Sequence, residues 1–350
     1  MERTSQLILR NIAQLDDQGL LLVNPPPDAL FQQLAAEGRE VMVFSQDFGD
    51  YGWLKNSGAR AHFGVLPDEA TIESVLPSHV LVFQPKEKER LAMMLHHLAE
   101  SMPADGRLWL VGENQAGIKS AGKQLDRYFD STTKLDSARH CVLYQASAPC
   151  PAEPFLLSNY QQKWLLGTPG EELRMVSLPG AFAHGRLDKG TELLLQVVNG
   201  LEGKARPRGN VLDFGCGIGV IGLSLVLRDP EIHLTLLDNS ALALESARLS
   251  AAANEIAVTL LPSDGLQSVD QRFDWIVSNP PFHRGVASTL DIARQFFSRA
   301  PGVLNKQGKM LLVCNQHLPY EAWLGEHFGR IETLASNNHF RVLKAAGPQF

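Results

Sequence analysis

The 350-residue chain is 44% hydrophobic and 20% charged, which is typical of a globular protein and long enough for two domains. Its net charge of −6 argues against a protein that coats nucleic acid without specificity, and no apolar run approaches the roughly 20 residues of a membrane span. Scattered cysteines without a CxxC pair and histidines without metal-ligand spacing indicate no metal site, and with no signal-peptide pattern we expect a cytoplasmic protein.

Apolar runs and helical stretches alternate through the first half of the chain. The apolar runs predict strands at residues 20–23, 80–83, 108–111 and 141–144. Pro27 predicts the start of a helix, because proline is tolerated in a first helical turn, and residues 89–102 predict another helix. The first strand runs into Asn24-Pro25-Pro26-Pro27, a turn without glycine.

The second half repeats this alternation more clearly. It predicts strands at residues 211–214, 233–237, 258–261, 275–278, 310–313 and 340–343. It predicts helices at residues 191–199, 220–227, 241–254 and 293–304. Strands that alternate with helices favour a parallel, doubly wound sheet, in which ligands bind at the carboxyl ends of the strands.

The two halves resemble each other. Residues 106–115 match residues 308–316, and in both halves the match follows a helical stretch and leads to a final strand. Residues 80–86 take the place of residues 275–281. Three similar segments in the same order favour two copies of one α/β unit over an unrelated α/β domain at the N-terminus.

The copies differ at the turn after their first strand. Residues 210–219 run into a glycine-rich turn, whereas residues 20–27 do not, so the N-terminal copy is expected to keep the fold without a ligand loop. Three prolines within residues 148–154 mark a linker. We therefore expect a degenerate domain at 1–147, a linker at 148–160 and a catalytic domain at 161–350.

The glycine turn and the strand ends beside it predict a cofactor site. Gly215, Gly217 and Gly219 let the backbone approach a ligand closely. Residues 217–222 also satisfy G-x-G-x-x-G, so a nicotinamide cofactor is one interpretation, although that pattern alone is weak.

An acid at each of three successive strand ends favours another cofactor. Asp213 is placed to meet an ammonium group, and Asp238 is placed to accept hydrogen bonds from both hydroxyls of a ribose. Asp264 is placed to meet an adenine amine. Taken singly, Asp238 is typical of a helix N-cap and Asp264 of a turn. As an ordered set they suit S-adenosylmethionine (SAM), whereas a nicotinamide dinucleotide would need a pyrophosphate cradle.

The fourth strand end carries Asn279-Pro280-Pro281-Phe282. Proline donates no backbone hydrogen bond and fixes φ, so the two prolines end the strand and hold the Asn279 side chain and the Pro280 carbonyl as rigid acceptors. Phe282 adds a flat apolar face. A lone Asn-Pro-Pro is more typical of a plain turn, but beside this cofactor site it suits a planar group with an NH2, such as the exocyclic amine of a nucleobase.

Together these motifs resemble the class I SAM-dependent methyltransferases that modify exocyclic amines. The two-copy layout resembles the bacterial ribosomal RNA guanine-N2 methyltransferases, which have two tandem Rossmann-like methyltransferase domains, the N-terminal one degenerate. Residues 182–190 are similar to that family's loop before the glycine motif. Residues 84–86, 111–114 and 136–141 look most like its 16S (small-subunit) enzyme, and residues 335–340 are closer to the 23S (large-subunit) paralogue.

The resemblance implies SAM-dependent methylation of N2 of a specific guanine in 16S rRNA, within the small subunit or an assembly intermediate, by a monomeric protein. Asn279 and Pro280 would accept hydrogen bonds from the amine, and Phe282 would stack on a base rotated out of its helix. The residues expected to contact the RNA are Arg186, Lys189, His283, Arg284 and Lys86. The alternatives are a 23S rRNA methyltransferase, a protein-glutamine methyltransferase and a non-enzymatic RNA assembly factor; with no DNA-recognition module evident, a DNA adenine methyltransferase is disfavoured.

Overall fold

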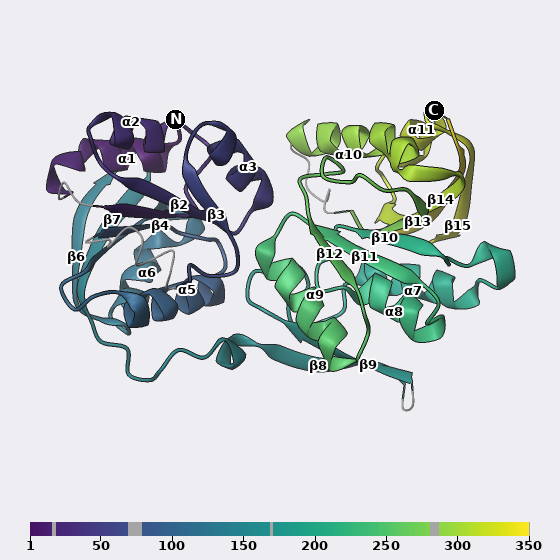
Figure 1. Cartoon of the computed structure of the whole chain (residues 1–350), viewed down its shortest axis with the longest axis horizontal. Coiled ribbons are helices and arrows are strands. Elements are labelled where there is room, and N and C mark those ends of the chain that lie inside the picture. Colours follow the sequence, from purple (N-terminus) through teal and green to yellow (C-terminus); the bar gives the residue numbers. More distant parts are fainter. Residues whose placement is uncertain (16–18, 69–78, 169–170, 281–286, 350) are drawn as a thin grey trace. The chain divides into compact units, whose positions relative to one another are not determined.

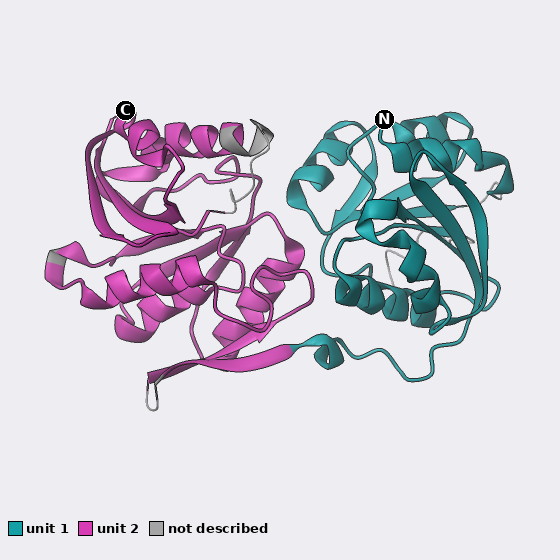
Figure 2. Cartoon of the chain, turned by 180° about the vertical axis from the view of Figure 1, so that it is seen from behind, with its two compact units in different colours: residues 1–161 teal, residues 162–350 magenta. Residues whose placement is uncertain are grey.

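The computed structural model describes residues 1–15, 19–68, 79–168, 171–280 and 287–349. The chain forms two compact units, Met1–Gln161 and Gln162–Phe350 (Figure 2). Phe282, His283 and Arg284, which were expected to contact substrate, lie outside the described residues.

The first unit is built on a seven-stranded sheet of order β3-β2-β1-β4-β5-β7-β6. Its strands are β1 (Leu20–Val23), β2 (Val41–Ser45), β3 (Arg60–Phe63), β4 (His79–Phe83), β5 (Arg107–Glu113), β6 (Phe129–Ala138) and β7 (Cys141–Pro149). Its helices are α1 (Arg3–Arg10), α2 (Leu30–Ala36), α3 (Phe48–Asn56), α5 (Lys88–Ser101) and α6 (Ile118–Leu125). Alternate strand residues serve two cores: Leu20 and Leu22 pack with α1 and α2, and Leu21 and Val23 pack with α5 and α6.

The second unit begins with a separate hairpin of β8 (Gln162–Thr168) and β9 (Glu171–Ser177), followed by a second seven-stranded sheet of order β12-β11-β10-β13-β14-β16-β15. Its strands are β10 (Asn210–Phe214), β11 (His233–Asp238), β12 (Thr259–Pro262), β13 (Phe273–Ser278), β14 (Leu304–Asn315), β15 (Phe328–Ser336) and β16 (Phe340–Pro348). Its helices are α7 (Lys189–Gly200), α8 (Val220–Arg228), α9 (Ala241–Ala253), α10 (Ala287–Arg299) and α11 (Tyr320–Gly325). Figure 1 shows α7, α8 and α9 on one face of this sheet and α10 and α11 on the other, each face with its own apolar core.

The two sheets have the same strand order, which confirms the predicted duplication. In each, five parallel strands are followed by an antiparallel pair, β7 and β6 in one and β16 and β15 in the other. Buried apolar residues form the central strands, as their sequences predict. The carboxyl ends of β10, β11, β12 and β13 therefore meet at one edge of the second sheet.

Some boundaries differ from those expected. The helix expected from Pro27 begins at Leu30, because residues 27–29 form a turn in which Asp28 Oδ1 accepts a hydrogen bond from the Leu30 amide at 3.0 Å. The hairpin β8–β9 was not predicted. Between the units, β7 continues to Pro149, and the chain up to Tyr160 is tied to α5, because the His96 ring bonds the Tyr160 hydroxyl and the Glu153 carbonyl, both at 2.8 Å.

Candidate active site

A cavity of about 470 Å³ lies at the carboxyl ends of four strands of the second sheet, a size typical of small-molecule sites. Each strand end contributes to its wall: Gly215 and Gly217 after β10, Asp238 at the end of β11, Asp264 after β12 and Asn279 after β13. The structure thus brings together five of the residues predicted for cofactor and substrate, at the edge where doubly wound sheets bind ligands.

The glycine turn provides a cradle without side chains. Gly215, Gly217 and Gly219 have φ values of 65°, 54° and 85°, in the left-handed region that favours glycine. A Cβ added to Gly217 would find its nearest neighbour, the Phe182 Cβ, at 3.8 Å, so the backbone there is open on the cavity side. A Cβ at Gly222 would lie 2.8 Å from Leu234 Cδ1, which shows how closely α8 packs on β11.

Asp238 lines the cavity and ties two ligand-binding segments together. Its Oδ2 accepts a hydrogen bond from the Gly217 amide, and its Oδ1 accepts one from the Ser240 amide at the start of α9, both at 2.9 Å. A carboxylate only accepts hydrogen bonds, so this fixed group suits a ligand that presents donors, such as hydroxyl groups. Asp264 also lines the cavity, where it is exposed between Ser263 and Gly265.

Asp213 lies beneath the glycine turn and does not line the cavity. Its Oδ2 accepts a hydrogen bond from the Gly222 amide at 2.8 Å, and the residue is fully buried. Burial raises the pKa of Asp213 to about 7, opposed by the Gly222 hydrogen bond and reinforced by the Asp238 charge. We expected this carboxylate at the cofactor's ammonium group; the structure instead places it where it fixes the start of α8.

Asn279 is held by Thr191 of α7 and by Asp188, the residue that caps this helix. Its Nδ2 donates hydrogen bonds to Asp188 Oδ2 and to Thr191 Oγ1, both at 2.9 Å. Because a carboxylate only accepts hydrogen bonds, the nitrogen of the amide must face Asp188. Both amide protons are therefore used inside the protein, and the Asn279 Oδ1 is the group that remains to accept a hydrogen bond from a ligand in the cavity.

Sequence reasoning missed Asp188 and Thr191. Asp188 caps α7, since its Oδ2 accepts from the amides of Gly190 and Thr191 at 2.8 and 3.0 Å. The sequence carries this capping signal, an Asp just before an apolar helix, but gives no sign of the second contact with Asn279. Phe182 and Ile292, which are half exposed, also line the cavity and were not predicted.

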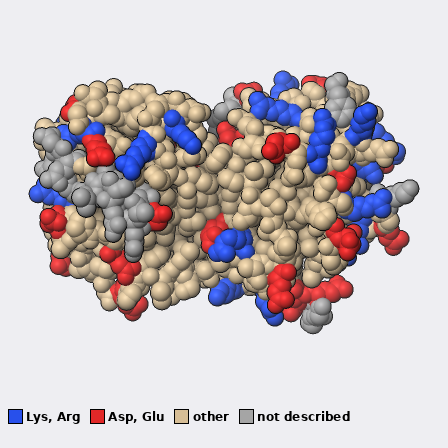
Figure 3. Space-filling model, in the orientation of Figure 1, with Lys and Arg blue, Asp and Glu red and all other residues tan. Residues whose placement is uncertain are grey.

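The remaining predicted contacts are scattered. Pro280 is buried directly after Asn279, Arg186 is exposed on the loop before α7, and Lys189 is exposed at the first position of α7. Lys86 is exposed between β4 and α5 of the other unit. On the face of the second unit seen in Figure 3, basic side chains gather around α10 and α11, and acidic ones gather near the β8–β9 hairpin.

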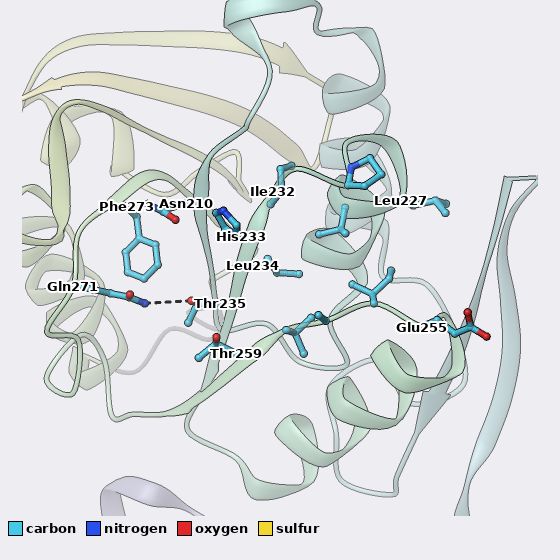
Figure 4. Close-up of a pocket in the computed structure, with 15 residues that line it drawn as sticks. Asn210, Leu227, Ile232, His233, Leu234, Thr235, Glu255, Thr259, Gln271 and Phe273 are labelled. Carbon is cyan, nitrogen blue, oxygen red and sulfur yellow. Dashed lines mark hydrogen bonds between the residues drawn. The ribbon is translucent and has the colours of Figure 1, made fainter.

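A larger hollow of about 640 Å³ lies at the opposite end of the same strands (Figure 4). Its wall includes the first residues of β10, β11 and β12, namely Asn210, His233 and Thr259, with apolar side chains such as Leu227. Its Gln271 donates a hydrogen bond to Thr235 Oγ1 at 3.3 Å. The glycine turn and the strand-end acids all lie at the other edge of the sheet. The smaller cavity is therefore identified as the active site by the residues that line it, although its volume is lower.

Among the described residues, no helix is long and apolar enough to cross a membrane, and no group of three or more His, Cys, Asp or Glu side chains is arranged to bind a metal. The sheet order, the glycine turn, the Asp238 carboxylate at the cavity and the oriented Asn279 define an S-adenosylmethionine-dependent methyltransferase. The site fits SAM because side-chain acceptors at successive strand ends line the cavity beside the open glycine backbone.

Comparison with known proteins gives the same class. The family model "Methyltransferase small domain" matches residues 172–344, and "Methyltransferase small domain N-terminal" matches residues 5–164. The chain is 37% identical over 346 residues to "Ribosomal RNA small subunit methyltransferase C" of Shewanella loihica, covering 98% of both chains. It is 38% identical over 342 residues to the protein of the same name from Shewanella sediminis, covering 97% of this chain and 96% of that one.

A solved structure shares the whole architecture. The T. thermophilus 16S rRNA N2 G1207 methyltransferase (RsmC), in complex with AdoMet and guanosine, superposes with a TM-score of 0.82 at 24% identity, covering 99% of this chain and 92% of that one. This likeness confirms the fold of two tandem methyltransferase domains. On the full-length identities above, the chain belongs to the family of ribosomal RNA small subunit methyltransferase C.

Proposed function

We propose that this protein transfers the methyl group of SAM to the exocyclic N2 amine of a specific guanine in 16S rRNA. The observation that carries the proposal is the orientation of Asn279, which lines the cavity: both of its amide protons are bonded to Asp188 and Thr191, which leaves its oxygen as the acceptor for an N–H group. The names of the relatives and the guanosine in the T. thermophilus complex support the same substrate.

The chemistry of transfer sets what the protein must do. SAM supplies a methyl group activated by its sulfonium, whereas the guanine N2 lone pair is delocalised into the ring. Hydrogen bonds from the amine to the Asn279 Oδ1 and the Pro280 carbonyl favour a pyramidal nitrogen whose lone pair points at the methyl. The N–C bond forms as the S–C bond breaks, and the nitrogen then releases a proton, so no strong general base is needed.

Positioning is therefore the main contribution of these residues. Asn279 is 8% exposed and Thr191 6% exposed, so the contacts that orient the amide are shielded from water. Asp188 adds a charge-assisted bond, which is stronger than a neutral one. We propose that Phe282, which lies outside the described residues, stacks on the guanine, a contact worth about 1–3 kcal/mol.

The proposed partner is 16S rRNA within the small subunit or an assembly intermediate, bound by a monomeric protein in the cytoplasm. Exposed Arg186 and Lys189 beside the site would contact phosphates, together with His283 and Arg284. In the other unit, Lys86 would contribute if the degenerate copy also positions RNA. We propose that residues 1–147 form the degenerate domain and residues 161–350 the catalytic domain, with residues 148–160 as the linker between them.

The test is transfer of tritium from labelled SAM into separated 16S rRNA, 23S rRNA and protein, using ribosomal subunits from cells that lack this enzyme. We expect label in 16S rRNA, recovered as N2-methylguanosine. Label in 23S rRNA would indicate that the substrate is the large subunit. Among the segments compared with the family, only residues 335–340 favour that substrate. Label in protein would indicate a glutamine methyltransferase, and no label would indicate an assembly factor.

A matched pair of variants tests the site. Asn279→Ala should abolish transfer and leave the Kd for SAM nearly unchanged, because Asn279 acts on the substrate amine. Gln271→Ala removes an amide at the opposite end of the same strands and should leave both unchanged. Equal loss of transfer and SAM binding in Asn279→Ala would contradict the assignment.

A further inference from the structure

A second hollow adjoins the methyl-transfer site. It has a volume of about 600 Å³ and is formed by three segments: Lys189 at the start of α7, Asn315, Gln316 and His317 where β14 ends, and Asn338, His339 and Phe340 in the turn from β15 to β16. Lys189 directly follows Asp188, which holds Asn279, so the hollow starts one residue from the network that orients the target amine.

The lining has the composition of a surface that recognises bases. It carries three side-chain amides, two imidazoles and one ammonium group, and no carboxylate. Gln316, His317, Asn338 and His339 are exposed, and within the described part of the chain their side chains make no hydrogen bond. Amides and imidazoles both donate and accept, which matches the mixed edges of unpaired bases, and the single Lys189 suits a phosphate.

The backbone beneath these side chains is fixed. Asn337 Oδ1 accepts hydrogen bonds from the amides of His339 and Phe340 at 2.9 and 2.8 Å, and the Gln316 amide donates to the His339 carbonyl at 2.8 Å. The Phe340 ring packs on Gly190, where an added Cβ would lie 3.3 Å from Phe340 Cε1. The turn is thus anchored to the first turn of α7, which reduces the ordering cost when a ligand binds.

We propose that this hollow receives the nucleotide next to the target guanine and reads its base, with Lys189 on the neighbouring phosphate. The inference rests on the proposed function and adds to it a site for sequence recognition. The hollow includes Asn338, His339 and Phe340, which belong to the segment 335–340 whose sequence is closer to the large-subunit paralogue. Differences in this hollow could therefore give related enzymes different RNA targets.

The test compares the double variant Asn338→Ala/His339→Ala with His233→Ala, which removes an exposed imidazole at the opposite edge of the sheet. Substrates are small subunits reconstituted with 16S transcripts in which the nucleotide on either side of the labelled guanine is changed. The double variant should raise the KM for the natural transcript about tenfold, as expected for a lost base contact, and lose the ranking among transcripts. His233→Ala should behave as wild type, and the Kd for SAM should stay the same in both variants.

Lys189→Ala provides an independent measurement. Because a phosphate contact carries no sequence information, this variant should raise KM alike for every transcript and weaken the salt dependence of binding. A double variant with the KM and transcript ranking of wild type would overturn the inference while leaving the proposed function intact. Wild-type protein that labels no RNA would overturn both.

Discussion

Replacing Thr191 with valine tests the orienting role of α7. Valine has nearly the same shape as threonine but lacks the oxygen that accepts from Asn279 Nδ2 at 2.9 Å. Among the described residues, the Thr191 hydroxyl makes no other hydrogen bond, whereas Asp188 also caps α7, so Thr191 gives the cleaner perturbation. Thr191→Ser keeps the hydroxyl and is the matched control.

The size of the effect follows from burial. Asn279 is 8% exposed, and leaving one of its amide protons without a partner costs about 1–3 kcal/mol. The side chain avoids part of this cost by rotating, which turns its oxygen away from the substrate. Because the charge-assisted bond to Asp188 remains, the lower end of the range applies, and every 1.4 kcal/mol is about tenfold. We therefore expect kcat to fall about five- to tenfold.

The assay is steady-state methyl transfer to 16S rRNA with parallel titration of SAM. Thr191→Val should lower kcat without changing the Kd for SAM, and Thr191→Ser should recover most of kcat. A Thr191→Val enzyme as fast as wild type would refute the orienting role. A Thr191→Ser enzyme as slow as Thr191→Val would show that the methyl group matters, through packing, and not the hydrogen bond.

Three further variants probe the cofactor site. Asp238→Ala should raise the Kd for SAM at least about tenfold in calorimetry, because hydrogen bonds to a charged group contribute about 1.5–3 kcal/mol. An unchanged Kd would contradict the predicted contact between Asp238 and the ribose. Gly222→Ala should lower the free energy of unfolding in urea by about 1–3 kcal/mol, since its Cβ would overlap Leu234; an unchanged midpoint would show that the leucine moves aside freely. Because the pKa of Asp213 is about 7 when folded against an ordinary 3.8, its protonation favours the folded state. That stability is fully present below about pH 4 and is lost as pH rises from there through about 7, at up to about 1.4 kcal/mol per pH unit. Asp213→Asn should flatten this slope in urea denaturation at pH 5 to 8; equal slopes would contradict the shift.

The sequence predicts the sheet well because its central strands are buried apolar runs. Residues 211–214, 233–237 and 275–278 all form strands within one or two residues of the expected limits. The hairpin β8–β9 was missed because, within the described residues, its two strands pair only with each other, and largely exposed runs such as 162–167 give a weak apolar pattern. Local patterns thus predict elements that bury their residues and fail for those that do not.

In the active site too, the sequence predicts some residues and misses others. Asp238 and Asn279 follow strands directly, so their place at the cavity could be inferred from topology alone. The contacts of Asn279 with Asp188 and Thr191 span 91 and 88 residues, a distance over which a single sequence carries no pairing signal. The sequence correctly placed Asp213 near the end of its strand. It could not give the direction of the side chain, because that depends on where the Gly222 amide lies in three dimensions.

The degenerate copy shows what separates a fold from a site. At the ends of its strands, Gln46 is 1% exposed and its Oε1 accepts hydrogen bonds from Asn24 Nδ2 and from Arg90 Nε, both at 2.9 Å. Gln84, which follows β4, donates to the Ala116 carbonyl at 3.0 Å. The Gln46 oxygen is thus bonded within the protein, and burial lowers the pKa of the Arg90 guanidinium beside it. In the second copy, Asp238 and Asn279 line the cavity at the strand ends, and glycine leaves the backbone open there. Apolar strand residues form the cores of both sheets, so the strand-end residues can differ between the copies without loss of the fold.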